Sequence, residues 1–198
     1  GSLTVNFIRL VFGFAMMGLY LLAADGHILP LDAGGKVWVF LSLSGLIGFA
    51  LGDLFLFQAF VLIGARISML IYASVPIITS LFGLIFLNEK LGLMEIAGML
   101  LTVTGIAVVV LDGNREKRGK NNHFIKGIAL AVLGSAGQAA GLIISKFGMS
   151  GYENAFGSNM IRIIAGMAGF AVIITFMKRW GKIRNAFQRE FITSTGRL

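Results

Sequence analysis

The sequence contains no cysteine and only two prolines in 198 residues. Without cysteine, the chain has no disulfide framework, no thiolate zinc site and no cysteine nucleophile. Charged residues are also scarce, at 13%, whereas a water-soluble domain usually carries about 25%. Because hydrophobic residues make up 57% of the chain, a soluble fold of this size could not bury its apolar surface. A lipid bilayer is the solvent that fits this composition.

Long apolar runs recur along the chain, each suited to a helix that crosses a bilayer core of roughly 30 Å. Inside lipid, a helix satisfies all of its own backbone hydrogen bonds. We therefore predict an all-α integral membrane protein that is a polytopic helix bundle. The predicted spans are 3–24, 37–63, 67–87, 92–111, 124–146 and 156–177.

The net charge of +8 does not indicate a nucleic-acid partner, because Lys and Arg lie mainly between the apolar runs and in the C-terminal tail. Charges there orient helices. By the positive-inside rule, the hydrophilic block 112–122 and the tail are predicted to lie in the cytoplasm. The basic residues behind this prediction are Arg66, Arg115, Lys117, Arg118, Lys120, Lys126, Lys178, Arg179, Lys182, Arg184 and Arg189. The opposite loops carry Asp25, Asp32, Glu89, Glu95 and Glu153.

A short internal similarity links the two sides of the hydrophilic block. Asn6 and Arg9 in the first span match Asn159 and Arg162 in the sixth, with the same spacing of three residues. Many secondary transporters are built from duplicated halves, and their substrate site lies where the halves meet. Alignment of the sixth span on the first gives five helices per half, so the chain is expected to hold helices two to seven of ten.

Asp53 lies deep in the second span, far from either end. A charged side chain at the bilayer centre costs at least ~2.5 kcal/mol on insertion scales, so it usually faces a cavity, a proton path or a polar partner. Two interpretations stay open. Asp53 either binds a cationic group or a transported proton, or it pairs with a basic residue or a Ser or Thr of a neighbouring helix.

Other polar residues inside the spans complete a predicted substrate pathway. Gln138 is a mid-span amide that needs a partner, either the solute or another helix. Pro76 removes a backbone donor, and the resulting break either lines a site or is a simple kink. The two arginines of the internal similarity either reach the membrane interface or attract an anionic solute group. The candidate pathway residues are Asp53, Gln138, Tyr72, Ser74, Pro76, Asn6, Arg9, Asn159 and Arg162.

Small residues form a stripe on the second span and another on the fifth. Such stripes let helix backbones approach closely, so packing is the favoured interpretation, with a substrate-accessible groove as the alternative. The stripes consist of Gly45, Gly48 and Gly52, and of Gly137 and Gly141. His27 and His123 are single loop histidines, so we infer no metal site and no cofactor.

Several segments resemble a known family. They are Gly64-Ala65-Arg66-Ile67-Ser68, Ser74-Val75-Pro76, Leu87-Asn88-Glu89-Lys90-Leu91 and the glycine-containing helix 98–106. With them, nearly the whole chain resembles the EamA-type branch of the drug/metabolite transporter superfamily. The sequence departs from the family's pattern twice. Asn88 stands where the family usually has Gly, and the helix around Gln138 lacks a frequent Trp.

The resemblance implies a ten-helix carrier of two inverted five-helix repeats, with both termini in the cytoplasm. That orientation would put the hydrophilic block outside, contrary to the charge bias. We expect an incomplete first repeat at 1–112 that lacks its first helix, a basic linker at 113–123 and the start of a second repeat at 124–198.

The resemblance also implies a secondary transporter that moves small metabolites or amino acids, often outward. We expect an exporter working by alternating access in the bacterial plasma membrane, with homodimerisation as one option. A membrane interaction or assembly protein that does not transport is the alternative. An intramembrane aspartyl protease is a remote third, because its chemistry requires two carboxylates and Asp53 is the only mid-span aspartate. We therefore expect no enzyme.

Overall fold

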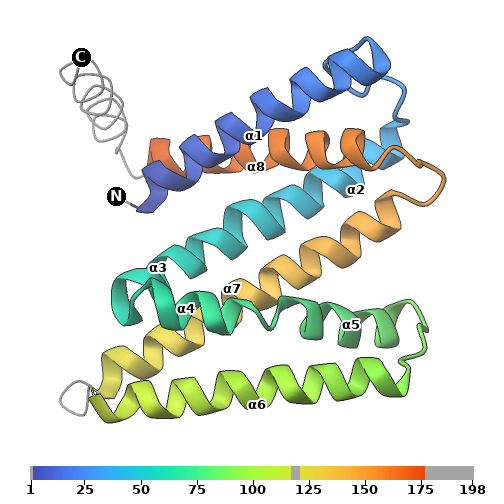
Figure 1. Cartoon of the computed structure of the whole chain (residues 1–198). Coiled ribbons are helices and arrows are strands. Elements are labelled where there is room, and N and C mark those ends of the chain that lie inside the picture. The colour runs from blue at the N-terminus through green and yellow to red at the C-terminus, as the bar shows by residue number, and fades with distance from the viewer. Residues whose placement is uncertain (1, 117–120, 177–198) are drawn as a thin grey trace.

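The computed structural model describes residues 2–116 and 121–176, and within these ranges the protein is a helix bundle (Figure 1). The predicted C-terminal basic tail and Lys117, Arg118 and Lys120 of the predicted linker lie outside the described residues. The helices are α1 (Ser2–Asp25), α2 (Gly35–Gly45), the π-helix η1 (Leu46–Gly52), α3 (Asp53–Ile63), α4 (Ala65–Tyr72), α5 (Val75–Phe86), α6 (Leu93–Glu116), α7 (Asn121–Gly148) and α8 (Ala155–Phe176).

Among the described residues, six helical segments are long and apolar enough to cross a membrane, and they confirm the predicted polytopic all-α fold. Each predicted span end lies within two residues of the observed one. The observed segments are Val5–Ala24, Gly35–Ile63, Ala65–Phe86, Leu93–Leu111, Asn122–Gly148 and Ala155–Phe176.

The hydrophilic block between the fourth and fifth spans is more helical than its composition suggests. Helix α6 continues through Glu116 and α7 begins at Asn121, so the described ends of the predicted linker 113–123 belong to these two helices. Backbone hydrogen bonding does not stop where apolar residues end, because a helix can extend into water past the bilayer. The division of the chain into two repeats stays a prediction.

Two of the predicted spans are interrupted. The second contains η1 between α2 and α3, and the third is divided into α4 and α5 at residues 73 and 74. Pro76 lies in the first turn of α5, where its missing N–H costs nothing, whereas the same proline would break a continuous helix. The predicted break at Pro76 is therefore present, and it begins a new helix.

Two tight turns connect the spans at backbone conformations that few residues adopt. Gly64, between α3 and α4, has φ +82° and ψ +159°, a region essentially restricted to glycine. Asn88, after α5, has φ +53°. Asparagine is one of the few side chains that tolerate this left-handed conformation, which explains how it replaces the glycine usual in the family.

Helix α7 runs through the middle of the bundle and contacts α2, η1, α3, α4 and α5. Helix α8 packs against α1, α2 and η1, while α6 lies at the edge against α4 (Figure 1). In the most apolar 18-residue stretch of α6, no residue is buried, whereas 44% of the residues are buried in the corresponding stretches of the second and sixth spans. An apolar helix with so little cover is suited to contact with lipid.

The ends of the spans gather at two opposite ends of the bundle (Figure 1). One end holds the α3–α4 turn with Arg66 and the start of α7 with Lys126. The other end holds the α1–α2, α5–α6 and α7–α8 connections, which carry Asp32 and Glu153. The structure thus groups the loops as an alternating membrane topology requires. Which end faces the cytoplasm stays a prediction.

Candidate functional site

Asp53 is paired inside the bundle. It begins α3, directly after η1, and is 1% exposed. Asn6 Nδ2 donates a hydrogen bond to Asp53 Oδ2 at 3.1 Å, and Arg9 forms an ion pair with the same oxygen. Both partners come from α1. The pairing interpretation of Asp53 is therefore the one that this conformation displays, and the Arg9 side chain, 56% exposed, lies at the outer edge of the pair.

Arg162 on α8 is buried without a carboxylate. The residue is 7% exposed, and its guanidinium carbon lies 4.8 Å from the centroid of the Phe49 ring. Its Nε and Nη2 atoms are buried and have no hydrogen-bond partner in the described part of the chain. The ion pairs recorded among the described side chains are Arg9–Asp53 and Lys146–Glu89, and neither includes Arg162.

The contact with Phe49 does not offset the cost of burying the charge of Arg162. A desolvated cation–π contact contributes about 2 kcal/mol, whereas the removal of one ion from water costs several kcal/mol even after relaxation. Phe49 alone therefore compensates only part of the cost of burying this charge.

Gln138 on α7 approaches Arg162 across Gly48 of η1. A methyl group added at Gly48 would lie 2.9 Å from Gln138 Oε1 and 3.7 Å from Arg162 Nη2. Both atoms therefore adjoin the same glycine. Gln138 Oε1 is also buried without a hydrogen-bond partner, so an acceptor and a donor, each unpaired, lie near each other.

Tyr72 lies near both charged groups. It ends α4, directly before the α4–α5 break, and it is half-buried. Its phenol lies within electrostatic range of Asp53, Arg9 and Arg162. We use the name polar cluster for the resulting set, which consists of Asn6, Arg9, Asp53, Tyr72, Gln138 and Arg162.

The π-helix η1 directly precedes Asp53 and contacts α7 and α8, which carry Gln138 and Arg162. π-Helical turns are rare and are frequently found at functional sites, and η1 spans the seven residues immediately before Asp53. It also contains Gly48 and Gly52 of the predicted small-residue stripe, while Gly45 precedes it. Neither the π-helix nor its position could be seen in the sequence, because the apolar run continues through it without a change in composition.

The predicted small residues all lie at close helix contacts. A methyl added at Gly141 would lie 2.9 Å from the Ser44 carbonyl oxygen, and one added at Gly52 would lie 3.2 Å from the Gln138 amide nitrogen. The corresponding distance from Gly137 to the Gly52 Cα is 3.1 Å, and a methyl at Gly45 would overlap the backbone of Arg162. These contacts hold α2 and η1 at backbone distance from α7 and α8.

The other predicted pathway residues lie apart from the hydrogen bonds of the polar cluster. Ser74 is half-buried at the α4–α5 break, and Pro76 faces outward. Asn159 is half-buried on α8, three residues before Arg162. Within residues 2–116 and 121–176, none of the three side chains forms a recorded hydrogen bond to the cluster.

Two buried contacts were missed by sequence reasoning. Phe49 beneath Arg162 is one of 17 phenylalanines, and nothing local distinguishes it from one that faces lipid. The Ser44 hydroxyl donates to the Gly141 carbonyl oxygen at 2.6 Å and is fully buried. Its position next to Gly45 in the small-residue stripe was the available signal.

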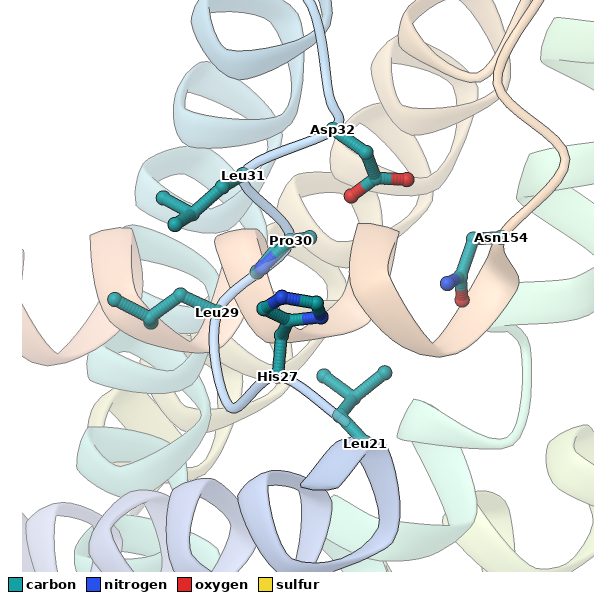
Figure 2. A pocket seen from close by; sticks show the side chains of 7 residues that line it. All are labelled: Leu21, His27, Leu29, Pro30, Leu31, Asp32 and Asn154. Atoms are coloured by element: carbon teal, nitrogen blue, oxygen red, sulfur yellow. The ribbon is translucent and has the colours of Figure 1, made fainter. Parts of the chain in front are cut away.

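A cavity of ≈ 450 Å³ lies at one end of the bundle, away from the polar cluster. It is located between the α1–α2 loop and the start of α8, and Figure 2 shows His27, Asp32 and Asn154 around it. Tyr152 donates a hydrogen bond to Asp32 at 3.2 Å beside this cavity. Among the described side chains, no three His, Asp or Glu residues gather as metal ligands would. The rest of the cavity lining is apolar and consists of Leu21, Leu29, Pro30 and Leu31.

The fold and the polar cluster together define an integral multi-pass membrane protein with charged side chains inside its bundle. Such buried charges in spans mark substrate or ion pathways. The model of the EamA-like transporter family matches residues 1–111, and the chain belongs to this family. This assignment confirms the resemblance seen in the sequence and a drug/metabolite transporter-type function. No curated protein matches the chain.

The match divides the polar cluster. Residues 1–111 include Asn6, Arg9, Asp53 and Tyr72, whereas Gln138 and Arg162 lie beyond it. The family is one of transporters and not of enzymes. The partners bonded to the Asp53 carboxylate are an amide and a guanidinium, whereas an aspartyl protease needs a second carboxylate there.

Proposed function

We propose that this chain forms the solute pathway of a secondary carrier that exports small metabolites or amino-acid-like solutes by alternating access. The observation that carries the proposal is the polar cluster, whose charged side chains come from α1, α3 and α8 within an apolar bundle. Ionisable residues inside spans are costly, so they are retained where they serve a solute or an ion.

Two irregular backbone segments support alternating access. Carriers place their sites at discontinuous helices, because broken segments can change conformation while whole helices move as rigid bodies. Here η1 precedes Asp53 and the α4–α5 break follows Tyr72. Both irregularities therefore adjoin the polar cluster.

The finer parts of the proposal rest on different support. Export and the bacterial plasma membrane follow from the family resemblance.

A homodimer is proposed through the outward face of α6, where Gly98 and Gly105 have no described neighbouring atoms within 4 Å of an added methyl. Glycine on an outward helix face allows a second helix to approach closely. Photobleaching steps of the labelled protein in liposomes at high dilution distinguish a dimer from a monomer.

The carrier function is tested by reconstitution of the intact protein in liposomes loaded with radiolabelled amino acids and amine metabolites. For at least one solute class, we expect faster efflux than from liposomes that carry the same solute but no protein. Asp53→Asn removes the charge that orders Arg9 and Asn6, and its efflux should fall about tenfold or more, as expected when a buried charged hydrogen bond is lost. Arg66→Gln, at an exposed arginine of the α3–α4 turn, is the matched control and should transport normally.

Three results of this experiment are informative. The carrier function is supported if Asp53→Asn lowers the efflux and Arg66→Gln does not. Efflux that Asp53→Asn leaves unchanged removes Asp53 from the mechanism. Absence of efflux for every solute, with the protein folded in the vesicles, contradicts a carrier and favours an assembly protein.

A further inference from the structure

We infer that the cavity between the α1–α2 loop and the start of α8 binds a phospholipid with an ethanolamine headgroup, whose ammonium group pairs with Asp32. The lipid is a bound membrane component and not the transported solute, so the inference goes beyond the proposed carrier function. The cavity of ≈ 450 Å³ is lined by one carboxylate, two side chains with N–H donors and four apolar side chains. Its volume lies within the range of about 300–1,000 Å³ that is usual for ligand pockets.

The cavity lies where two spans end. The first span ends at Ala24, three residues before His27. The sixth span begins at Ala155, directly after Asn154. Both His27 and Asn154 line the cavity. Because the apolar length of a span matches the hydrocarbon core of the bilayer, side chains just beyond the span ends lie at the level of the lipid headgroups.

The α1–α2 loop exposes apolar side chains at this level. Leu31 is 74% exposed, and Ile28 and Leu29 are exposed as well, although all three lie outside the spans. Exposed apolar patches mark surfaces that contact a partner or a membrane. Tyr20 and Phe156, at the neighbouring ends of α1 and α8, are half-exposed and stack with ring centroids 4.2 Å apart. Aromatic side chains are enriched at the membrane–water interface, so this surface is suited to the first part of a lipid acyl chain.

Asp32 supplies a negative charge that the described side chains do not neutralise. The Tyr152 hydroxyl donates a hydrogen bond to Asp32 Oδ1 at 3.2 Å, and neither recorded ion pair includes Asp32. Gly157 leaves space for this hydroxyl, since a methyl added there would lie 2.5 Å from it. A neutral phenol orients the carboxylate without removing its charge. The complementary ligand group is therefore a cation.

The chemistry of the lining favours a primary ammonium over a quaternary one. A primary ammonium has three N–H donors for a carboxylate, whereas a quaternary ammonium has none and is bound by aromatic cages. Among the described residues, none that lines the cavity is Phe, Tyr or Trp. The Asn154 Oδ1 atom accepts a hydrogen bond from the Gly157 N–H at 2.9 Å, so Nδ2 is the donor end of this amide. Amide and imidazole N–H groups are suitable donors to the phosphate of the same headgroup.

The polar and apolar side chains lie on different sides of the cavity. Figure 2 shows Asp32 and Asn154 on one side, Leu29 and Leu31 on the other, and His27 between them. A phospholipid uses both sides, because its zwitterionic headgroup is joined to an apolar body. A soluble amine would use the polar side alone, so the lining favours the lipid.

Native mass spectrometry of the intact protein, released from detergent, tests the inference by measuring the binding of single lipids. The probes are dioleoyl lipids with ethanolamine, N-methylethanolamine, choline and glycerol headgroups, which share their acyl chains. We expect affinity to fall from ethanolamine through N-methylethanolamine to choline, as N–H donors are lost. The anionic glycerol lipid should bind most weakly, because it brings a negative charge to Asp32. Soluble phosphoethanolamine at equal concentration should not displace the ethanolamine lipid, since it has no acyl chains.

Two variants separate the headgroup contact from the apolar contact. Asp32→Asn should lower affinity for the ethanolamine lipid about fivefold, the upper end for an exposed ion pair, and leave the choline lipid unchanged. Leu31→Ser should weaken the binding of every probe by the same factor. Glu153→Gln removes the same charge from an exposed position at the same end of the bundle, outside the cavity lining. It is the matched control and should keep the wild-type order of affinities.

Four results would overturn the inference. They are equal affinities for the ethanolamine and choline lipids, an ethanolamine preference that survives Asp32→Asn, an equal loss of preference in Glu153→Gln, and displacement by soluble phosphoethanolamine. The third result would indicate a diffuse effect of surface charge, and the fourth a site for a soluble amine. Size-exclusion chromatography verifies folding, and if Asp32→Asn does not fold, the headgroup series on the wild type decides. None of these results bears on the carrier function, because no flux is measured.

Discussion

At the scale of single residues, the matched arginines of the internal similarity have different surroundings. Arg9 forms an ion pair with Asp53, whereas Arg162 lies over Phe49 without a carboxylate. Equal sequence positions therefore do not give equal chemistry, because the partner of each arginine comes from a helix far away in the chain. Arg9 is neutralised by Asp53 at the outer edge of their ion pair, whereas Arg162 forms no ion pair among the described side chains.

Asn88 gives a prediction at this scale. Its φ of +53° costs an ordinary L-residue roughly 1–2 kcal/mol, and a β-branched residue is strained most. Asn88→Val should therefore lower the free energy of unfolding by about that amount, whereas Asn88→Gly should leave it unchanged or raise it. Thermal unfolding in detergent measures both. Equal unfolding temperatures for the two variants would mean that the turn does not adopt this conformation.

At the scale of helices, close backbone contact determines how α2 and η1 meet α7. A methyl at Gly141 would encounter the Ser44 carbonyl oxygen and the Gly48 Cα at 2.9 and 3.0 Å. Neither atom can move independently, because both belong to a helix backbone. By contrast, Gly98 on α6 has no neighbour within 4 Å of an added methyl.

The two glycines form a matched pair for a prediction about packing. Gly141→Ala should destabilise the bundle by about 1–3 kcal/mol, the usual cost of overpacking. In the monomer, Gly98→Ala should be neutral or stabilise the bundle by up to about 1 kcal/mol, since alanine favours a helix. Steric-trap or denaturant unfolding in bicelles measures the difference. A Gly141→Ala protein as stable as Gly98→Ala would show that α2 and α7 are less closely packed than described.

At the scale of the whole molecule, membrane orientation is the property for which two lines of argument disagree. The charge bias puts the α6–α7 end in the cytoplasm, and the family resemblance puts it outside. The structure places Arg66 and Lys126 together at this end and Lys90 and Glu153 at the opposite end. The disagreement therefore concerns only which end is inside.

Cysteine labelling resolves the orientation, because the sequence contains no cysteine that would react in the background. We expect Arg66→Cys and Lys126→Cys to be protected in intact cells from a maleimide that does not cross membranes. Lys90→Cys and Glu153→Cys should be labelled. The reverse pattern would establish the family's orientation and refute the charge bias. A mixed pattern within either pair would contradict the six-span topology itself.

Much of the fold could be predicted, because the length and apolarity of a span are local properties of the sequence. The six spans, the break before Pro76 and the family were correctly predicted. The continuation of α6 and α7 into the hydrophilic block was not, since helix formation in water does not depend on an apolar run. The π-helix was also missed, because its hydrogen-bond register has no signature in composition.

The sequence alone determined that the chain resides in a membrane, since a chain with few charges and long apolar runs cannot form a stable fold in water. It also identified most polar side chains that need partners, because an unpaired polar group in hydrocarbon is costly wherever it lies. Only the tertiary structure decided which partners they have. Asp53 pairs with Arg9 and Asn6, whereas Arg162 lies over an aromatic ring and forms no ion pair with the described side chains. Those outcomes depend on which faces of distant helices meet, and the glycines between the helices control that approach.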